Sequence, residues 1–193
     1  PRLFKGVNES SLRSVKWDGD MNLWIYPFIM SGINTRIVRR SNALMNFLYG
    51  RSFRYSEVSS NSKGFIGYFR SILMLMALAS LRVCISFETS LWFLKKFILP
   101  KPGQGPNREK RENGFFKLSL VGSNKGNKIT LSVEGNKDPG YAATARMITE
   151  SALSLILNRD SLPKASGVLT PAAGIGKVLV DRLKNRGITF KLE

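Results

Sequence analysis

The residue types that usually carry acid–base, nucleophilic or metal chemistry are scarce in this sequence. Histidine is absent, which removes every Ser-His or Cys-His nucleophile and every histidine-based metal site. The single cysteine, Cys84, supplies too few thiolates for a zinc or iron–sulfur site and has no partner for an internal disulfide. Catalysis by this chain alone would therefore need lysine, tyrosine or carboxylate side chains, or a cofactor.

The spacing Gly-x-Gly occurs twice, and neither pair has the sequence context of a nucleotide site. Gly103 and Gly105 precede Pro106, where a dinucleotide-binding turn would need a strand before it and a helix after it. Gly174 and Gly176 lie within an expected helix and indicate close packing instead. Neither GxGxxG nor GxxxxGK[ST] occurs. We therefore expect no cofactor-binding residue, no catalytic residue and no metal ligand in this chain.

Polar side chains gather at one expected helix start. In the turn Asp138-Pro139-Gly140, aspartate and proline favour a reversal and glycine permits close backbone approach. The helix that follows presents free N–H groups to any anion at its start. Tyr141 and Thr144 are therefore candidate contacts for a substrate or a domain junction. The alternative is a packed helix start with a satisfied tyrosine hydroxyl, and the sequence leaves both interpretations open.

The second half of the chain must position these residues. Residues 99–113 contain two Pro–Gly clusters and a dense run of charges, which predicts an exposed loop. Residues 115–122 and 128–135 alternate between apolar and polar types around a Gly/Asn turn, so they predict an antiparallel hairpin. The pattern further predicts helices at 141–157 and 172–186, a short strand at 168–170 and a last strand at 188–193.

The first half of the chain has weaker signals. Residues 1–20 are expected to be irregular, and residues 22–28 are expected to form a strand interrupted by Pro27. A helix is predicted from Asn34, as its N-cap, to Gly50, as its stop, followed by a short strand at 51–58.

The most unusual stretch is residues 64–101, where two apolar runs are separated by charges. A charge interrupts after ten apolar residues, short of the about 20 that a membrane-spanning helix needs. The pattern fits a buried helical insertion or helices in a membrane interface, and composition does not choose between them. If a membrane is bound, the candidate contacts are Arg70, Arg82, Trp92, Lys95 and Lys96.

The net charge of +17 is spread along the chain rather than gathered into a tail. The nearest approach to a cluster is Arg36, Arg39, Arg40, Arg51 and Arg54. The first three are expected to form a solvated helix face or to contact a phosphate or lipid headgroup. Because nucleic-acid sites normally combine clustered charge with aromatic residues, a partnership with nucleic acid is not expected.

These elements predict an α+β protein: a β-hairpin or small mixed sheet with packed helices and a helical apolar insertion. We divide it into residues 1–63, an N-terminal part of a substrate or interaction region; 64–101, the apolar insertion; and 102–193, the hairpin with a C-terminal helix–strand return. The chain opens at Pro1 rather than methionine, which suggests that it is part of something longer.

The C-terminal third resembles the end of saccharopine-dehydrogenase-like oxidoreductases. That ending has a Gly-Tyr-x-x-Thr helix start, a polar Leu-Pro loop and a Gly-Val-x-Thr-Pro turn before the last helix. The matching residues are Gly140, Tyr141, Thr144, Leu162, Pro163, Gly167, Val168, Thr170 and Pro171. Ser166 departs from the first glycine of many relatives. Residues 37–41, the apolar insertion and residues 101–116 match in order and spacing, so the resemblance covers most of the chain from Pro27 onward.

The resemblance implies a truncated relative of an enzyme built from a Rossmann domain and an α+β domain. The Rossmann domain, which would bind NAD(P), has no counterpart here and is an expected partner. Animal members are associated with membranes and lipid droplets, and microbial relatives include a trans-acting enoyl reductase of lipid synthesis. The protein is accordingly expected to be intracellular and membrane-associated, at a lipid droplet or mitochondrion, with a lipid or membrane surface as a second partner.

Two functions follow from these observations. The first is the C-terminal fragment of a nicotinamide-dependent oxidoreductase of this family, linked to lipid metabolism and inactive alone. The second is a membrane or lipid-droplet surface-binding module without enzymatic activity, acting through residues 64–101 and the positive charge.

Overall fold

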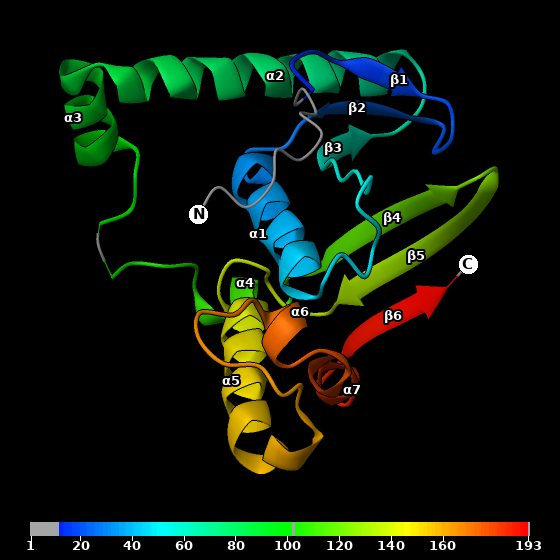
Figure 1. The fold of residues 1–193 in the computed structure, drawn as a ribbon. Coiled ribbons are helices and arrows are strands. Elements are labelled where there is room, and N and C mark those ends of the chain that lie inside the picture. Colours follow the sequence, from blue (N-terminus) through cyan, green and yellow to red (C-terminus); the bar gives the residue numbers. More distant parts are fainter. Residues whose placement is uncertain (1–11, 102, 193) are drawn as a thin grey trace. The chain divides into compact units, whose positions relative to one another are not determined.

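A computed structural model of the chain describes residues 12–101 and 103–192. The chain divides into two compact units, Pro1–Lys101 and Pro102–Glu193. Each unit contains helices and one three-stranded antiparallel sheet, so the α+β class expected from the sequence is confirmed (Figure 1). The expected mixed sheet is wrong, because every strand pairing in the described residues is antiparallel.

The sheet of the first unit has the order β1-β2-β3. Its strands are β1 (Lys16–Asp18), β2 (Leu23–Pro27) and β3 (Val58–Asn61). Helix α1 (Ser31–Leu44) lies between β2 and β3 in the chain. The buried side chain of Asn42 fixes the loop that follows the helix. The Asn42 side chain donates to the Gly50 carbonyl and accepts from the Tyr49 N–H, both at 2.9 Å.

Helix α2 (Phe65–Ser86) packs against this sheet through its first turns. The Trp24 indole donates to the Gly64 carbonyl at 3.1 Å, and its ring lies 4.8 Å from that of Tyr68. The Asn61 amide donates to the Ser71 hydroxyl at 3.0 Å. Gly67 is required here, because a Cβ atom at this position would lie 1.7 Å from the Ser62 carbonyl oxygen.

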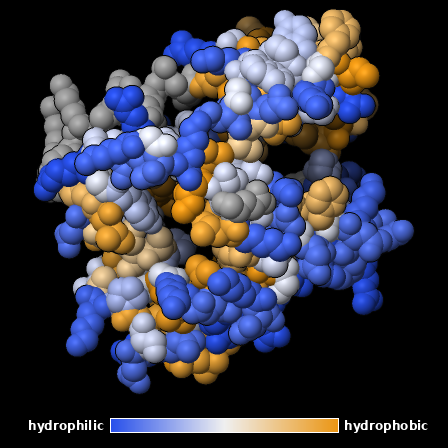
Figure 2. Space-filling view, turned by 90° about the vertical axis from the view of Figure 1, so that its right-hand side faces the viewer, coloured by the Kyte–Doolittle hydropathy of each residue, from blue (hydrophilic) through white to orange (hydrophobic). Residues whose placement is uncertain are grey.

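Beyond these turns α2 runs past the sheet to α3 (Glu88–Phe97) (Figure 1). The 22-residue α2 is long and apolar enough, by length and composition, to cross a membrane. Its most apolar 18-residue stretch has a mean hydropathy of 1.6, and only 6% of that stretch is buried. Apolar side chains also reach the surface elsewhere, in patches between the charged ones (Figure 2). Whether residues 64–101 are a membrane-associated or a buried insertion stays a prediction.

The sheet of the second unit has the order β4-β5-β6. Its strands are β4 (Phe116–Asn124), β5 (Asn127–Gly135) and β6 (Ile188–Leu192). Lys125 and Gly126 form the two-residue turn of the β4–β5 hairpin, with φ of 47° and 87°. Positive φ at both central residues matches the right-handed twist of the flanking strands, and glycine adopts it without strain.

The helices of this unit are α4 (Arg108–Glu112), α5 (Ala142–Leu157), α6 (Pro171–Gly174) and α7 (Lys177–Lys184), with a 3₁₀ turn at Arg159–Ser161. The buried apolar residues of the described chain all belong to this unit; they are Ala143, Ala173, Ile175, Leu183 and Ile188. The apolar core therefore lies where α5, α6, α7 and the start of β6 meet.

A buried carboxylate joins two of these helices. Glu150 on α5 is 4% exposed and binds Arg182 and Arg186, from α7 and the residues after it. The contacting N–O distances are 2.8 Å to Arg182 and 3.0 Å to Arg186. Arg182 also donates to the Asn158 amide oxygen at 3.2 Å, which ties the end of α5 into the same network.

Several expected elements are confirmed, and others are shifted. The strand at 22–28, the hairpin, the helix at 141–157 and the last strand are present. The helix at 172–186 is wrong as one element, because Gly176, with φ of 62°, separates α6 from α7. The expected strand at 168–170 does not form. Residues before 12 lie outside the described part of the chain.

Three errors concern the first unit. Helix α1 begins before Asn34, whose side chain donates to Glu57 at 3.1 Å instead of capping the helix. The strand expected at 51–58 forms only at its end, as β3. The short strand β1 occurs in a stretch that was expected to be irregular.

We expect Glu150→Gln to lower the free energy of unfolding of residues 102–193 by about 3 kcal/mol, because it leaves two arginines without their buried anion. Amide hydrogen exchange of α5 and α7 in a urea series measures this loss. All three tryptophans, Trp17, Trp24 and Trp92, lie in the first unit, so their fluorescence reports that unit separately.

Glu112→Gln is the matched control, because it removes an exposed carboxylate that pairs with Lys137. Its loss should be much smaller, as expected for a solvated ion pair. Equal losses for the two variants would show that the buried pair has no special role.

Candidate functional site

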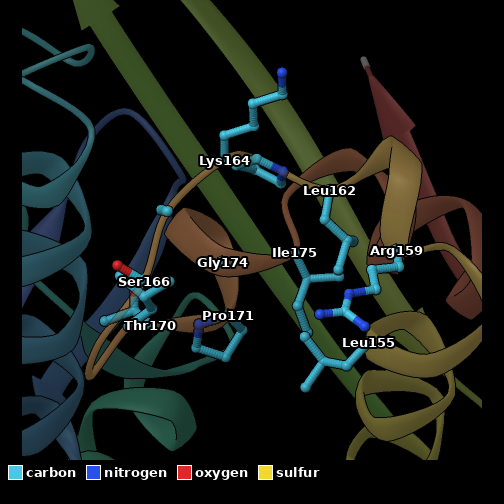
Figure 3. A pocket seen from close by; sticks show the side chains of 12 residues that line it. Leu155, Arg159, Leu162, Lys164, Ser166, Thr170, Pro171, Gly174 and Ile175 are labelled. Carbon is cyan, nitrogen blue, oxygen red and sulfur yellow. The ribbon is translucent and has the colours of Figure 1, made fainter.

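A hollow of about 590 Å³ lies on the second unit between the end of α5 and the start of α6 (Figure 3). Its apolar wall comes from both helices and from the loop that joins them. The lining residues are Leu155, Arg159, Leu162, Pro163, Lys164, Ala165, Ser166, Leu169, Thr170, Pro171, Gly174 and Ile175. Its volume lies within the about 300–1,000 Å³ of small-molecule sites.

The loop that lines this hollow follows from its prolines and glycines. Pro163 follows the C-cap of the 3₁₀ turn, and Gly167 adopts a φ of 97° that other residues rarely reach. Pro171 occupies the first position of α6, where its missing N–H is no loss. A Cβ atom on Gly174 would lie 3.3 Å from the Leu169 side chain, so this glycine allows the loop to pack closely on α6.

Two cations accompany the apolar wall. Figure 3 shows Arg159 turned toward Leu155 and Ile175, whereas Lys164 extends outward from the loop. Within the described residues neither cationic side chain has an ion pair or a hydrogen bond. The lining contains no carboxylate. The hollow therefore combines apolar surface with uncompensated positive charge.

The sequence analysis missed both cations. Leu162, Pro163, Thr170 and Pro171, which supported the family resemblance, do line the hollow. Arg159 and Lys164 flank the Leu-Pro pair in the sequence, and this spacing was the available signal.

The two candidate substrate contacts lie at the other end of α5. The Thr144 hydroxyl donates to the Pro139 carbonyl at 2.6 Å, and the Tyr141 N–H donates to the Asp138 carboxylate at 2.7 Å. The Tyr141 ring lies against Gly105, where a Cβ atom would be 3.2 Å away. Neither residue lines the hollow. Their role as substrate or junction contacts therefore stays a prediction.

The candidate membrane contacts are all exposed in α2 and α3. Arg70 and Arg82 lie on α2, and the other three lie on α3. The Lys96 ammonium lies 4.6 Å from the Trp92 ring centroid and 5.3 Å from that of Phe97, which makes it part of an aromatic cluster. Their contact with a membrane stays a prediction.

Polar side chains also gather beside the basic helix α1. One oxygen of Glu57 accepts from Asn34, while Oε2 is buried and has no hydrogen-bond partner among residues 12–101 and 103–192. Burial, and secondarily the Glu57 charge, raises the pKa of Tyr55 above its usual value. Arg36 on α1 is exposed, and Arg39 and Arg40 are engaged in interactions within the chain.

A nicotinamide dinucleotide does not fit the described residues. Its phosphates need a strand, a glycine-rich turn and a helix N-terminus in a parallel arrangement. Gly103 and Gly105 precede only the five-residue α4, and Gly176 follows a helix rather than a strand. The described residues also contain no group of three Cys, Asp or Glu side chains suited to a metal ion.

Comparisons with known proteins identify relatives of one kind. One relative is a Mycobacterium tuberculosis protein with the provisional name trans-acting enoyl reductase. It is 37% identical over 176 residues, which is 88% of this chain and 41% of the relative. Trans-acting enoyl reductases of Mycobacterium ulcerans and Mycobacterium bovis are each 36% identical over 86% of the chain and 40% of their own length. No protein-family model and no solved structure matches.

These names correct the family assigned from the sequence. The relatives are named enoyl reductases, which are a different family from the saccharopine-dehydrogenase-like oxidoreductases. The resemblance had included an enoyl reductase only as a microbial relative of that second family. That assignment is therefore wrong, and so is the fragment function derived from it. An oxidoreductase role agrees with the names, whereas the membrane and lipid-droplet module has no support in them. The chain is thus similar to trans-acting enoyl reductases and spans about 40% of their length.

Proposed function

We propose that this chain forms part of an enoyl reductase that acts in trans. Such an enzyme adds a hydride and a proton across a C=C bond conjugated to a carbonyl group, in a substrate carried by a separate molecule. Because the described residues do not fit a nicotinamide dinucleotide, this chain would contribute to binding the substrate rather than the hydride donor. The hydride donor, NAD(P)H, would bind to a nucleotide-binding region outside the residues described.

The observation that carries this proposal is the extent of the similarity. The matches at 36–37% identity cover 86–88% of the chain, which is more than either unit alone contains. Both units therefore take part in the similarity, and neither is an unrelated addition. The chain equals only about 40% of the length of these relatives, so the proposed activity requires further residues.

A chimera tests the proposal directly. The segment of the Mycobacterium ulcerans reductase that matches this chain is replaced by residues 1–193, and reduction of an enoyl N-acetylcysteamine thioester that the parent turns over is followed by NADPH oxidation. We expect the chimera to retain reduction within about a hundredfold of the parent, because more than a third of the aligned residues are identical.

The matched control carries the corresponding segment of the Mycobacterium bovis reductase, which shows whether a segment can be exchanged at all. An active control beside a folded, inactive chimera would contradict the proposal. Circular dichroism and size-exclusion chromatography establish that both chimeras are folded.

The 193-residue chain alone should not bind NADH or NADPH, since it presents no strand–turn–helix cradle for their phosphates. Isothermal titration calorimetry with both cofactors measures this. A saturable 1:1 complex with a Kd of roughly 10 µM or tighter would show that the chain has a nucleotide site of its own. AMP and inorganic phosphate serve as controls for nonspecific attraction to the +17 charge.

A further inference from the structure

We propose that the hollow between α5 and α6 binds an aliphatic chain that ends in an oxyanion, with the chain against the apolar wall and the anion at Arg159. The hollow lies wholly within the second unit. The inference rests on this hollow alone and does not require the proposed reductase activity.

The apolar part of the site has a wall with room for a chain. Leu155, Leu162, Leu169 and Ile175 contribute aliphatic surface from α5, the loop and the residue after α6. Leu155 is 53% exposed although it lines a concave surface, so a ligand there would remove apolar area from water. Each buried CH₂ group contributes to binding, whereas a polar ligand would gain little from this wall.

The anionic part of the site follows from a contrast within the same unit. Arg182 and Arg186 share the buried carboxylate of Glu150. Arg159, two residues beyond the end of α5, has no such carboxylate among the described residues, and Lys164 adds a second uncompensated charge at the rim. The planar guanidinium can donate two parallel hydrogen bonds to a carboxylate or a phosphate.

The geometry of Arg159 is set by its neighbours rather than by a ligand. Asn158 immediately before it is held by Arg182, and its N–H donates to the Ser154 carbonyl at the end of α5. The backbone at Arg159 is therefore anchored to the buried network. This places the exposed Arg159 side chain on a held backbone beside the apolar wall.

Carboxylate and phosphate share the required head-group chemistry, and the experiment separates them. The 193-residue chain is titrated with octanoate, octyl phosphate and octyltrimethylammonium, below their micelle concentrations, and two-dimensional NMR follows the α5–α6 amides. We expect saturable shifts at these amides with one or both anions, and none with the cation. Inorganic phosphate should bind at least tenfold more weakly than octyl phosphate, because it lacks the chain.

Two matched pairs of variants locate the site. Arg159→Gln should weaken anion binding about tenfold, as expected for a lost charge-assisted hydrogen bond, while Arg36→Gln on α1 changes net charge equally and should leave it unchanged. Leu155→Asn should weaken binding about threefold or more. Leu157→Asn should not, since Leu157 is a similarly exposed leucine of α5 outside the hollow.

The proposal is overturned if the cationic probe shifts the same amides as the anions, or if both members of a pair have equal effects. The first result would indicate an apolar surface without charge selection, and the second a nonspecific attraction to the basic chain. The NMR spectra of the variants report their folding at the same time. Because no turnover is measured, failure here leaves the chimera test of enoyl reduction unaffected.

Discussion

The buried Glu150 carboxylate is the interaction on which the second unit depends. Removing a charge from water costs several kcal/mol, so Glu150 is compatible with the fold only while Arg182 and Arg186 contact it. An apolar pair could hold α5 and α7 together equally well. In this structure, the hydrogen-bonded ion pair connects the two helices in one register. Through Asn158 that register extends to Arg159 and the hollow.

The first unit is organised differently. Apart from Gly67, its buried residues within the described chain are polar: Ser41, Asn42 and Ser71. The hydroxyls of Ser41 and Ser71 donate to helical carbonyls four residues earlier, and Asn42 holds a loop. Hydrogen bonds therefore define local geometry here, while many large apolar side chains remain exposed on α2 and α3. Because apolar burial is the main stabilising term in folding, this unit gains less from its own core than the second unit does.

The sequence predicted elements best where local pattern and local geometry coincide. The hairpin was predictable because alternation and a Gly-containing turn act over a few residues, and α5 because its small and apolar residues recur at helical spacing. The break at Gly176 was not predictable, because Pro171 and Gly187 suggest one uninterrupted helix. The two helices are distinguished only in the folded chain, where Gly176 lies near Pro163 and Gly174 packs against Leu169. Asn34 has the features of an N-cap, but its amide is committed to Glu57, a tertiary contact without a local signal.

The candidate site shows the same limit. Pro163 and Pro171 were recognisable as turn residues, yet the hollow they line depends on where α5 ends relative to α6. Arg159 appeared as one of 30 basic residues, and a lack of a carboxylate partner is visible only after folding. The family name was wrong for another reason: short motifs at a helix start or a turn report local geometry, which unrelated or distantly related enzymes share.

Three carboxylates of this unit are engaged with cations away from the hollow. The hydrogen bond and charge of Lys137 lower the pKa of Glu112, and those of Lys117 lower the pKa of Glu134. Glu150 is occupied by two arginines. These carboxylates are therefore engaged within the unit and are not located at the hollow. An anion arriving at Arg159 would consequently displace water rather than an internal ion pair, so its binding would not weaken the contacts that hold α5 to α7.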